Sequence, residues 1–283
     1  MRHTCAAICL AITLIAGAPG PGLAQQADTP SVVHLTDSLL VDRPVIDPYA
    51  AVVPYGPGER LEYNVKVGFF SGGKAHMEVL GIDTVRGEPT YHVEMDIKGG
   101  LLFGALKAES HYDSWIDTNL IMSRRFISDV SNTGHSSYRS FEFYPDEMYW
   151  DQTDEGVIGP LGSSLPLDDV SFLYFVRSLP LDVGETYTYT RYFKEDGNPV
   201  TLEVERRDVR KVGAGTFNTI VVRPTIQTSG LYKDGGDAEL HFTDDENRYL
   251  VYMRVAMPVV GSITLHLEKI IEGTPIHAGE PTW

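Results

Sequence analysis

An alternation of apolar and polar residues, with a period of two, is the feature that most constrains the fold of this chain. In residues 61–69 every odd position is apolar, and residues 91–98 repeat the pattern. Successive side chains of a β-strand point to opposite faces of the sheet, so each of these segments predicts a strand with one buried face. A sheet built from such strands has to cover one whole face.

Turn-forming residues separate the alternating segments, for example at Ser71–Gly73 and Arg86–Pro89. Short turns join antiparallel neighbours, so we expect a meander. Further strands are predicted at residues 108–116, 120–130, 136–144, 148–153, 185–193, 200–209, 217–227, 238–243, 248–257 and 262–271. Because the apolar face must be covered, the predicted fold is mainly β: a large curved antiparallel sheet or (half-)barrel meander. A two-sheet sandwich is the alternative.

Residues 168–184 interrupt the alternation. Asp168 or Asp169 can cap the N-terminus of a helix with its carboxylate, and Pro180 ends the run. Five consecutive apolar residues, 172–176, leave almost no polar face, so we predict one short buried helix near residues 168–179. A buried strand is the alternative, because periodicity does not distinguish the two structures in short apolar runs.

The N-terminus has the features of a secretory signal peptide. Arg2 and His3 give a short basic start, residues 5–18 form an apolar stretch too short to span a bilayer, and small residues precede Gln25. We therefore expect a signal peptide at residues 1–24 and an exported protein. Because no cysteine directly follows the predicted cleavage site, we expect no lipid anchor. We also expect no transmembrane segment in the mature chain.

Proline content divides the remainder of the chain. Residues 25–54 contain four prolines and no sustained period, which predicts an extended arm or linker. We expect a single β-rich domain at residues 55–272 and a disordered tail at residues 273–283. Both cysteines, Cys5 and Cys9, lie in the predicted signal peptide, so we expect no disulfide in the mature protein.

The charge balance and the absence of motifs limit the possible functions. Lys and Arg number 23 against 39 Asp and Glu, which disfavours nucleic acid and anionic membrane surfaces as partners. The sequence contains neither a nucleophile elbow nor an H-E-x-x-H zinc motif, and most histidines are scattered over polar positions of predicted strands. We therefore predict no catalytic residue, no metal ligand and no cofactor.

Two features indicate a hydrophobic ligand. Residues 99–106 form an apolar stretch punctuated by glycine between two predicted strands, although loops usually face water. This stretch either contacts a ligand or membrane, or covers the core. Arg177 closes the central apolar segment, where a buried guanidinium needs either a structural ion pair or the anionic head group of a ligand. The candidate ligand contacts are Leu101, Leu102, Phe103, Asp169, Tyr174 and Arg177.

Three short motifs stand out along the chain. They are Asp169-x-Ser171-x-x-Tyr174-x-x-Arg177 followed by Pro180-Leu181-x-x-Gly184, then Tyr112-Asp113-Ser114-Trp115-Ile116-Asp117 before Leu120 and Arg125, and Gly215-Thr216-Phe217-Asn218-Thr219. Together they resemble the signature of an exported bacterial family, the domain of unknown function 3108, from Tyr55 to Ile271. The resemblance implies a location in the periplasm or at the outer membrane and a fold similar to the half-barrels of periplasmic lipoprotein carriers. That family has no agreed activity or catalytic residues.

The sequence therefore leads to three hypotheses. The first is a non-catalytic envelope protein that binds a lipid or other hydrophobic small molecule in a β-barrel-like cavity. The second is a structural or protein-interaction module that contacts another envelope protein, and an exposed strand edge would favour it. The third is a hydrolase, which would need His, Asp and Ser groups to converge in one cleft and has the least support.

Overall fold

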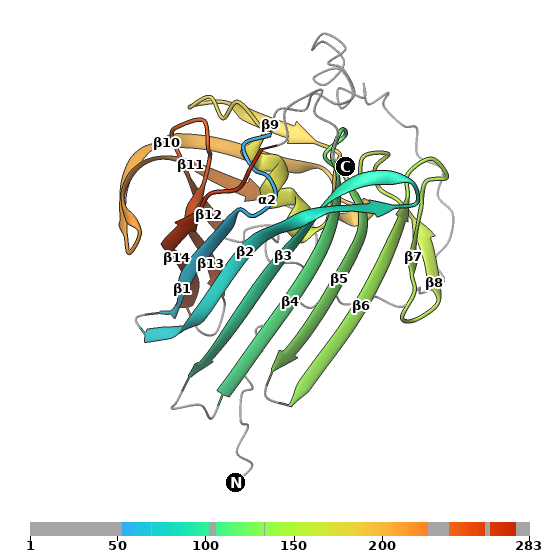
Figure 1. The fold of residues 1–283 in the computed structure, drawn as a ribbon, viewed down its shortest axis with the longest axis horizontal. Coiled ribbons are helices and arrows are strands. Elements are labelled where there is room, and N and C mark those ends of the chain that lie inside the picture. The colour runs from blue at the N-terminus through green and yellow to red at the C-terminus, as the bar shows by residue number, and fades with distance from the viewer. Residues whose placement is uncertain are drawn as a thin grey trace, which may run out of the picture.

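The computed structural model describes residues 53–68, 70–101, 106–132, 134–225, 238–257 and 261–275. These residues form one antiparallel sheet of fourteen strands and a single α-helix (Figure 1). The predicted curved antiparallel sheet with one short helix is confirmed, and the two-sheet sandwich is wrong. The predicted signal peptide, residues 102–105, and most of the predicted arm and tail lie outside the described residues.

The strands form two meanders joined at the centre of the sheet, where β1 pairs with both β2 and β14. The first meander consists of β1 (Arg60–Val67), β2 (Phe70–Val85), β3 (Glu88–Leu101), β4 (Leu106–Asp117), β5 (Ser123–Asn132), β6 (His135–Tyr144), β7 (Tyr149–Gln152) and β8 (Val157–Pro160). The second consists of β9 (Thr186–Tyr189), β10 (Val200–Val212), β11 (Gly215–Thr225), β12 (Ala238–Thr243), β13 (Leu250–Met257) and β14 (Gly261–Ile271). A short 3-10 helix, η2 (Glu195–Gly197), precedes β10.

Most predicted strands lie within a few residues of their expected bounds, and the differences have local causes. β5 begins at Ser123 rather than at residue 120, because Ile121 in the preceding turn has a positive φ of 47°. The strand predicted at residues 185–193 is the shorter β9, since the backbone of Phe193 bonds Gly162 and Leu167 instead of continuing the sheet. The short strand β8 was not predicted.

The helix α2 spans Asp169–Arg177, as predicted, and the buried-strand alternative is wrong. It begins with a capping box. The Asp168 carboxylate accepts hydrogen bonds from the backbone N–H groups of Val170 and Ser171 at 2.8 and 2.9 Å, and Asp168 N–H donates to Ser171 Oγ at 2.8 Å. Every residue of α2 is buried, and the helix packs against β3 and β4. We call the face of the sheet that packs on α2 the inner face, and the opposite face the outer face.

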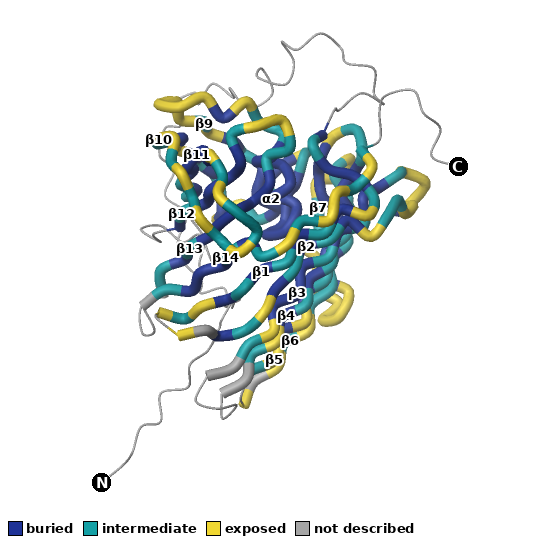
Figure 2. Tube along the Cα trace, turned by 60° about the vertical axis from the view of Figure 1, so that its left-hand side comes forward, coloured by how far each residue is buried: buried dark blue, intermediate teal, exposed yellow. Residues whose placement is uncertain are grey.

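Apolar residues line the inner face. In β3, every second residue from Tyr91 to Ile97 belongs to the hydrophobic core, whereas the residues between them lie on the outer face. Ring contacts join the sheet to the helix, because Tyr55 packs edge-on against both Tyr91 and Tyr174. Figure 2 shows that buried residues gather around α2 and become fewer towards the far ends of β3–β6.

Backbone hydrogen bonds join the two edges of the sheet beside α2. The N–H groups of Gly162 and Leu167, which follow β8, donate to the carbonyls of Phe193 and Arg191, which follow β9, at 2.8 and 2.6 Å. The centroid of the Phe193 ring also lies 5.3 Å from that of Phe143 in β6. We call this end of the barrel the closed end.

At the opposite end of the barrel, part of β6 has no neighbouring described strand on one side. β6 pairs with β7 over Phe141–Tyr144, and within the described residues no strand lies beside residues 135–139 on that side. In Figure 1 the strands β3–β6 extend well past α2 in this direction. We call this end the open end.

Candidate functional site

Arg177, at the end of α2, is fully buried at the closed end and forms an ion pair. Its terminal nitrogens donate to the two carboxylate oxygens of Glu59 at 2.6 and 2.9 Å, and one of them also donates to the Asn247 carbonyl at 3.1 Å. Such a bidentate pair satisfies both charges away from water. The structural ion pair is thus confirmed for Arg177, and its contact with a ligand head group stays a prediction.

Tyr174 and Asp169 also lie at the closed end. The Tyr174 ring packs edge-on against Tyr55, with ring centroids 4.9 Å apart. Asp169 accepts a hydrogen bond from the Tyr192 hydroxyl at 3.3 Å. Burial, together with the neighbouring carboxylate of Asp168, raises the pKa of Asp169 to about 6. Protein side chains surround both residues, and their contacts with a ligand stay predictions.

The predicted ligand residues do not form one cluster. Leu101 ends β3 at the open end, where it pairs with Leu106 of β4, and Leu102 and Phe103 lie outside the described residues. Ser114, which donates a hydrogen bond to the capping residue of α2, lies about 26 Å from Leu106 along β4, at roughly 3.3 Å per residue. The candidates from α2 and from the end of β3 therefore belong to separate places.

Near the open end, the inner face combines apolar side chains with two buried hydroxyl groups. The exposed fraction along β3 rises from 0% at Val93 to 5% at Met95 and 8% at Ile97, so the side chains are slightly less buried in this direction. In β4, Ser110 and Tyr112 are also buried. Among the described residues, Ser110 Oγ and the Tyr112 hydroxyl have no hydrogen-bond partner other than one another. We define the open-end surface as Met95, Ile97, Ser110, Tyr112 and Val130.

Strand pairing makes the residues of the open-end surface direct neighbours. Met95 lies opposite Tyr112, Ile97 lies opposite Ser110, and Ser110 lies opposite Val130 on the next strand. Burial raises the pKa of Tyr112, and a hydrogen bond with the Ser110 hydroxyl opposes this shift. The tyrosine is therefore neutral, and its hydroxyl can both donate and accept a hydrogen bond.

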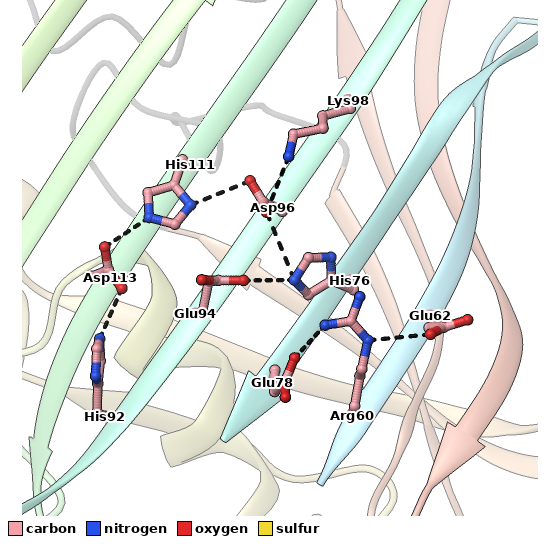
Figure 3. Close-up of polar contacts among 10 residues, drawn as sticks. All are labelled: Arg60, Glu62, His76, Glu78, His92, Glu94, Asp96, Lys98, His111 and Asp113. Carbon is pink, nitrogen blue, oxygen red and sulfur yellow. Dashed lines mark hydrogen bonds and ion pairs between the residues drawn. The ribbon is translucent and has the colours of Figure 1, made fainter. Parts of the chain in front are cut away.

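The outer face of β2, β3 and β4 carries histidines and carboxylates in alternation (Figure 3). His76 Nε2 lies 2.6 Å from a carboxylate oxygen of Glu94 and 3.7 Å from one of Asp96. His111 connects Asp96, 3.2 Å from its Nδ1, to Asp113, 2.8 Å from its Nε2. These contacts link three strands through side chains on one polar surface.

His92 completes this arrangement. Its Nε2 lies 2.8 Å from Asp113, and its ring stacks on Trp115 with centroids 4.3 Å apart. Burial favours neutral His111, but Asp113 and Asp96 outweigh burial and raise the pKa of His111. Burial likewise opposes the charge of Asp113, but His92 and His111 outweigh it and lower the pKa of that carboxyl. We define the histidine–carboxylate chain as Glu94, His76, Asp96, His111, Asp113 and His92.

No sequence motif predicts the histidine–carboxylate chain, because its members come from three strands. Strand pairing places His76 opposite Asp96, and Asp96 opposite His111. The alternation in the sequence identifies the polar face of each strand but not which residues face one another. A β-bulge between Val79 and Gly81 shifts the register of β2 against β3, and the sequence gives no sign of it.

The fold defines the class of this protein: one curved antiparallel sheet whose two edges are joined by backbone hydrogen bonds beside a buried helix. The chain belongs to the family described as "Protein of unknown function (DUF3108)", whose family model matches residues 62–268. The resemblance noted in the sequence is thereby confirmed.

Solved structures with low sequence identity are similar to this chain. A beta-barrel-like protein of domain of unknown function DUF1849 from Brucella abortus is 7% identical, with a TM-score of 0.46 over 77% of this chain and 98% of that chain. The hypothetical protein CT021 from Chlamydia trachomatis is 11% identical, with a TM-score of 0.37 over 85% of this chain and 100% of that chain. No curated protein matches the chain. Within the described residues, no helix has the length and apolar character needed to cross a membrane.

Proposed function

We propose that this protein is an exported, non-catalytic binding protein whose open-end surface holds a lipid or similar amphiphile. The observation that carries the proposal is the pair of buried hydroxyl groups of Tyr112 and Ser110, which among the described residues have no hydrogen-bond partner other than one another. A buried donor or acceptor left unpaired costs about 1–3 kcal/mol. A ligand whose head group hydrogen-bonds these hydroxyls would remove that cost.

The apolar neighbours of the two hydroxyls suit the rest of such a ligand. Met95, Ile97 and Val130 belong to the hydrophobic core and lie beside the hydroxyls on the same face. Burying an acyl chain against them stabilises the complex by about 0.8 kcal/mol for each CH₂ group removed from water. An apolar surface with a few polar groups is typical of small-molecule sites.

The N-terminal sequence supports a location where such a protein would meet lipids. The basic start and the apolar stretch at residues 5–18 predict export. The surplus of acidic residues suits a protein that stays in solution and does not adhere to anionic membrane surfaces. We place the protein in the periplasm or at the outer membrane on these grounds.

Analysis of a co-purified ligand tests the proposed function. The full chain is exported into a bacterial periplasm and purified without detergent, and an organic-solvent extract is analysed by mass spectrometry. We expect lipid at a level stoichiometric with the protein. Ile97→Asp, which places a charge on the open-end surface, and Tyr112→Phe should both reduce the lipid content.

Tyr138→Phe is the matched control, because Tyr138 is an exposed tyrosine of β6, and its lipid content should equal that of the wild type. An extract without lipid, repeated after incubation of the protein with envelope phospholipids, would contradict the proposed function. Equal lipid loss in Tyr112→Phe and Tyr138→Phe would contradict the assignment to the open-end surface.

A protein-interaction module is the second candidate, because the sheet ends in an exposed apolar strand. In β8, Val157 and Ile158 are 45% and 66% exposed, and among the described strands β8 pairs with β7 alone. An exposed edge can bind an extended peptide as an added strand. A lipid-free extract, together with an envelope protein that binds the wild type but not Ile158→Lys, would favour this candidate.

A further inference from the structure

Three members of the histidine–carboxylate chain hold their ligand atoms close together. His76 Nε2 and one oxygen each of Glu94 and Asp96 all lie within 4.8 Å of one another. His76 and Asp96 are paired across β2 and β3, and Glu94 lies two residues before Asp96 on the same face. Imidazole nitrogen and carboxylate oxygen are ligands that zinc and similar divalent ions bind. We propose that His76, Glu94 and Asp96 bind one zinc-like divalent transition metal ion on the outer face.

The observed distances suit this assignment after a small adjustment. Ligand atoms placed tetrahedrally at about 2.0–2.2 Å from a common ion lie about 3.3–3.6 Å apart. The separations of 2.6 Å from His76 Nε2 to Glu94 and of 3.7 Å to Asp96 lie on either side of that range. His76 Nε2 and Glu94 share a hydrogen bond, and a bound ion would take the place of its proton. Three protein ligands leave the fourth position for water.

A hollow in the outer face provides access for the ion. It has a volume of about 320 Å³, and His76 and Asp96 are among the residues that line it. Arg60, which also lines the hollow, is already paired with Glu62 and Glu78. Lys98 lies 3.4 Å from Asp96. Because the Lys98 side chain is 63% exposed, it can turn into water when an ion takes its place.

The rest of the histidine–carboxylate chain would orient the metal ligands. His111 Nδ1 lies 3.2 Å from the Asp96 oxygen that does not face His76, and Asp113 lies 2.8 Å from the other nitrogen of His111. Groups that hydrogen-bond a metal ligand on the side away from the ion fix its position and raise its affinity for the ion. His111 is therefore a positioning residue in this proposal.

The outer face also provides a matched histidine with different neighbours. His266 in β14 lies opposite Tyr252 of β13, and the guanidinium of Arg210 lies 3.6 Å from the centroid of the Tyr252 ring. Burial, Lys66 and Arg210 lower the pKa of His266 to about 4, although Glu268 opposes them. The same positive surroundings disfavour a metal ion, so His266→Ala is the control variant.

Zinc titration of the metal-free protein tests this proposal. The untagged full chain is treated with EDTA, dialysed, and titrated with zinc chloride by isothermal calorimetry near neutral pH. We expect one zinc ion per chain. His76→Ala and Asp96→Asn should weaken binding by more than about a hundredfold, His111→Ala by about tenfold, and His266→Ala by less than about twofold.

Asp96→Asn keeps the shape of the side chain, so it separates loss of a metal ligand from loss of the fold. Circular dichroism should show the wild-type spectrum for each variant. A wild-type protein that binds no zinc at concentrations up to about 0.1 mM would overturn the proposal. Zinc binding that is equally tight in His76→Ala would overturn it too. Calcium binding without zinc binding would contradict the choice of a transition metal.

Discussion

The closed and open ends of the inner face differ in the polar groups that they bury. At the closed end these groups are charged and connected: the Asp168 carboxylate accepts hydrogen bonds from the hydroxyls of Ser114 and Ser123 at 2.6 and 2.7 Å, and Arg177 pairs with Glu59. The open-end surface contains only apolar side chains and two neutral hydroxyls. A charged group is costly to bury without partners, whereas a hydroxyl costs far less. The comparison indicates that the closed end stabilises the fold and leaves the open end available for a ligand.

Unpaired atoms occur at the closed end as well, and their surroundings differ. The Tyr55 hydroxyl and Arg177 Nε also lack partners among the described residues. They belong to a cluster of rings in which Tyr55 packs against Tyr91 and Tyr174. Ser110, in contrast, lies beside Ile97 and Val130, which are 8% and 6% exposed, and Tyr112 stacks on Phe126 with ring centroids 6.3 Å apart. This difference supports the proposed ligand site at the open end.

The largest expected effect of a substitution is at Arg177. Arg177→Met leaves the Glu59 carboxylate buried without its cation, so the free energy of unfolding should fall by about 3–5 kcal/mol. Urea unfolding at pH 7, followed by circular dichroism, measures the change. Adding Glu59→Gln to this variant should recover part of the loss, because the buried charge is then removed. A loss below about 1 kcal/mol would contradict the conclusion that the closed end stabilises the fold.

A smaller loss is expected at the helix cap. Asp168→Ala removes the capping carboxylate, at a cost of about 0.5–2 kcal/mol. It also takes a partner from the hydroxyls of Ser114 and Ser123, so we expect a total loss of about 2–3 kcal/mol. Asp168→Asn, which can still cap the helix, should lose less than Asp168→Ala in the same unfolding experiment. Equal losses in both variants would show that the cap does not determine stability.

Asp169 should show an effect of the opposite sign. Its pKa in the folded protein is about 6, above the ordinary value of 3.8. Protonation therefore favours the folded state, and the stability that it contributes is present below about pH 4 and lost as the pH rises through about 6. We expect Asp169→Asn to be more stable than the wild type by about 1–2 kcal/mol at pH 7, with no gain near pH 4.

Unfolding measured across this pH range checks the prediction for Asp169. The difference between variant and wild type should grow between about pH 4 and pH 6 and then stay constant. A difference independent of pH would mean that the Asp169 carboxylate is not disfavoured by its burial.

The smallest change in stability is expected at the open end. Tyr112→Phe and Ser110→Ala remove hydroxyls that have no partner other than one another among the described residues. The free energy of unfolding of the lipid-free protein should therefore change by less than about 0.5 kcal/mol. The same variants should bind less lipid than the wild type. Losses of stability as large as that of Asp168→Ala would remove the distinction between a stabilising end and a binding end.

The parts of the fold that depend on local pattern could be predicted from the sequence. Alternation over residues 91–98 predicts β3 because strand geometry has the same period, and Asp168 with Pro180 predicts the limits of α2 because capping and proline act locally. The edge strand β8 was missed, since its four residues do not alternate clearly.

The parts that depend on distant residues could not be predicted. The ion pair of Arg177 joins residues 118 positions apart in the sequence, and nothing in the sequence marks Glu59 as its partner. The two hydroxyls of the open-end surface were missed because Ser110 and Tyr112 look like ordinary strand residues. Their lack of other partners becomes visible only when all neighbouring strands are in place.

Photolabelling with a palmitic acid that carries a diazirine in its acyl chain shows whether a lipid binds at the open-end surface. After irradiation and digestion, mass spectrometry identifies the labelled peptides. We expect labels in β3, β4 and β5, concentrated around Met95, Ile97 and Val130, and a loss of labelling in Ile97→Asp but not in Tyr138→Phe. Labels in α2 or β8, or labelling that Ile97→Asp does not change, would contradict a ligand site at the open-end surface.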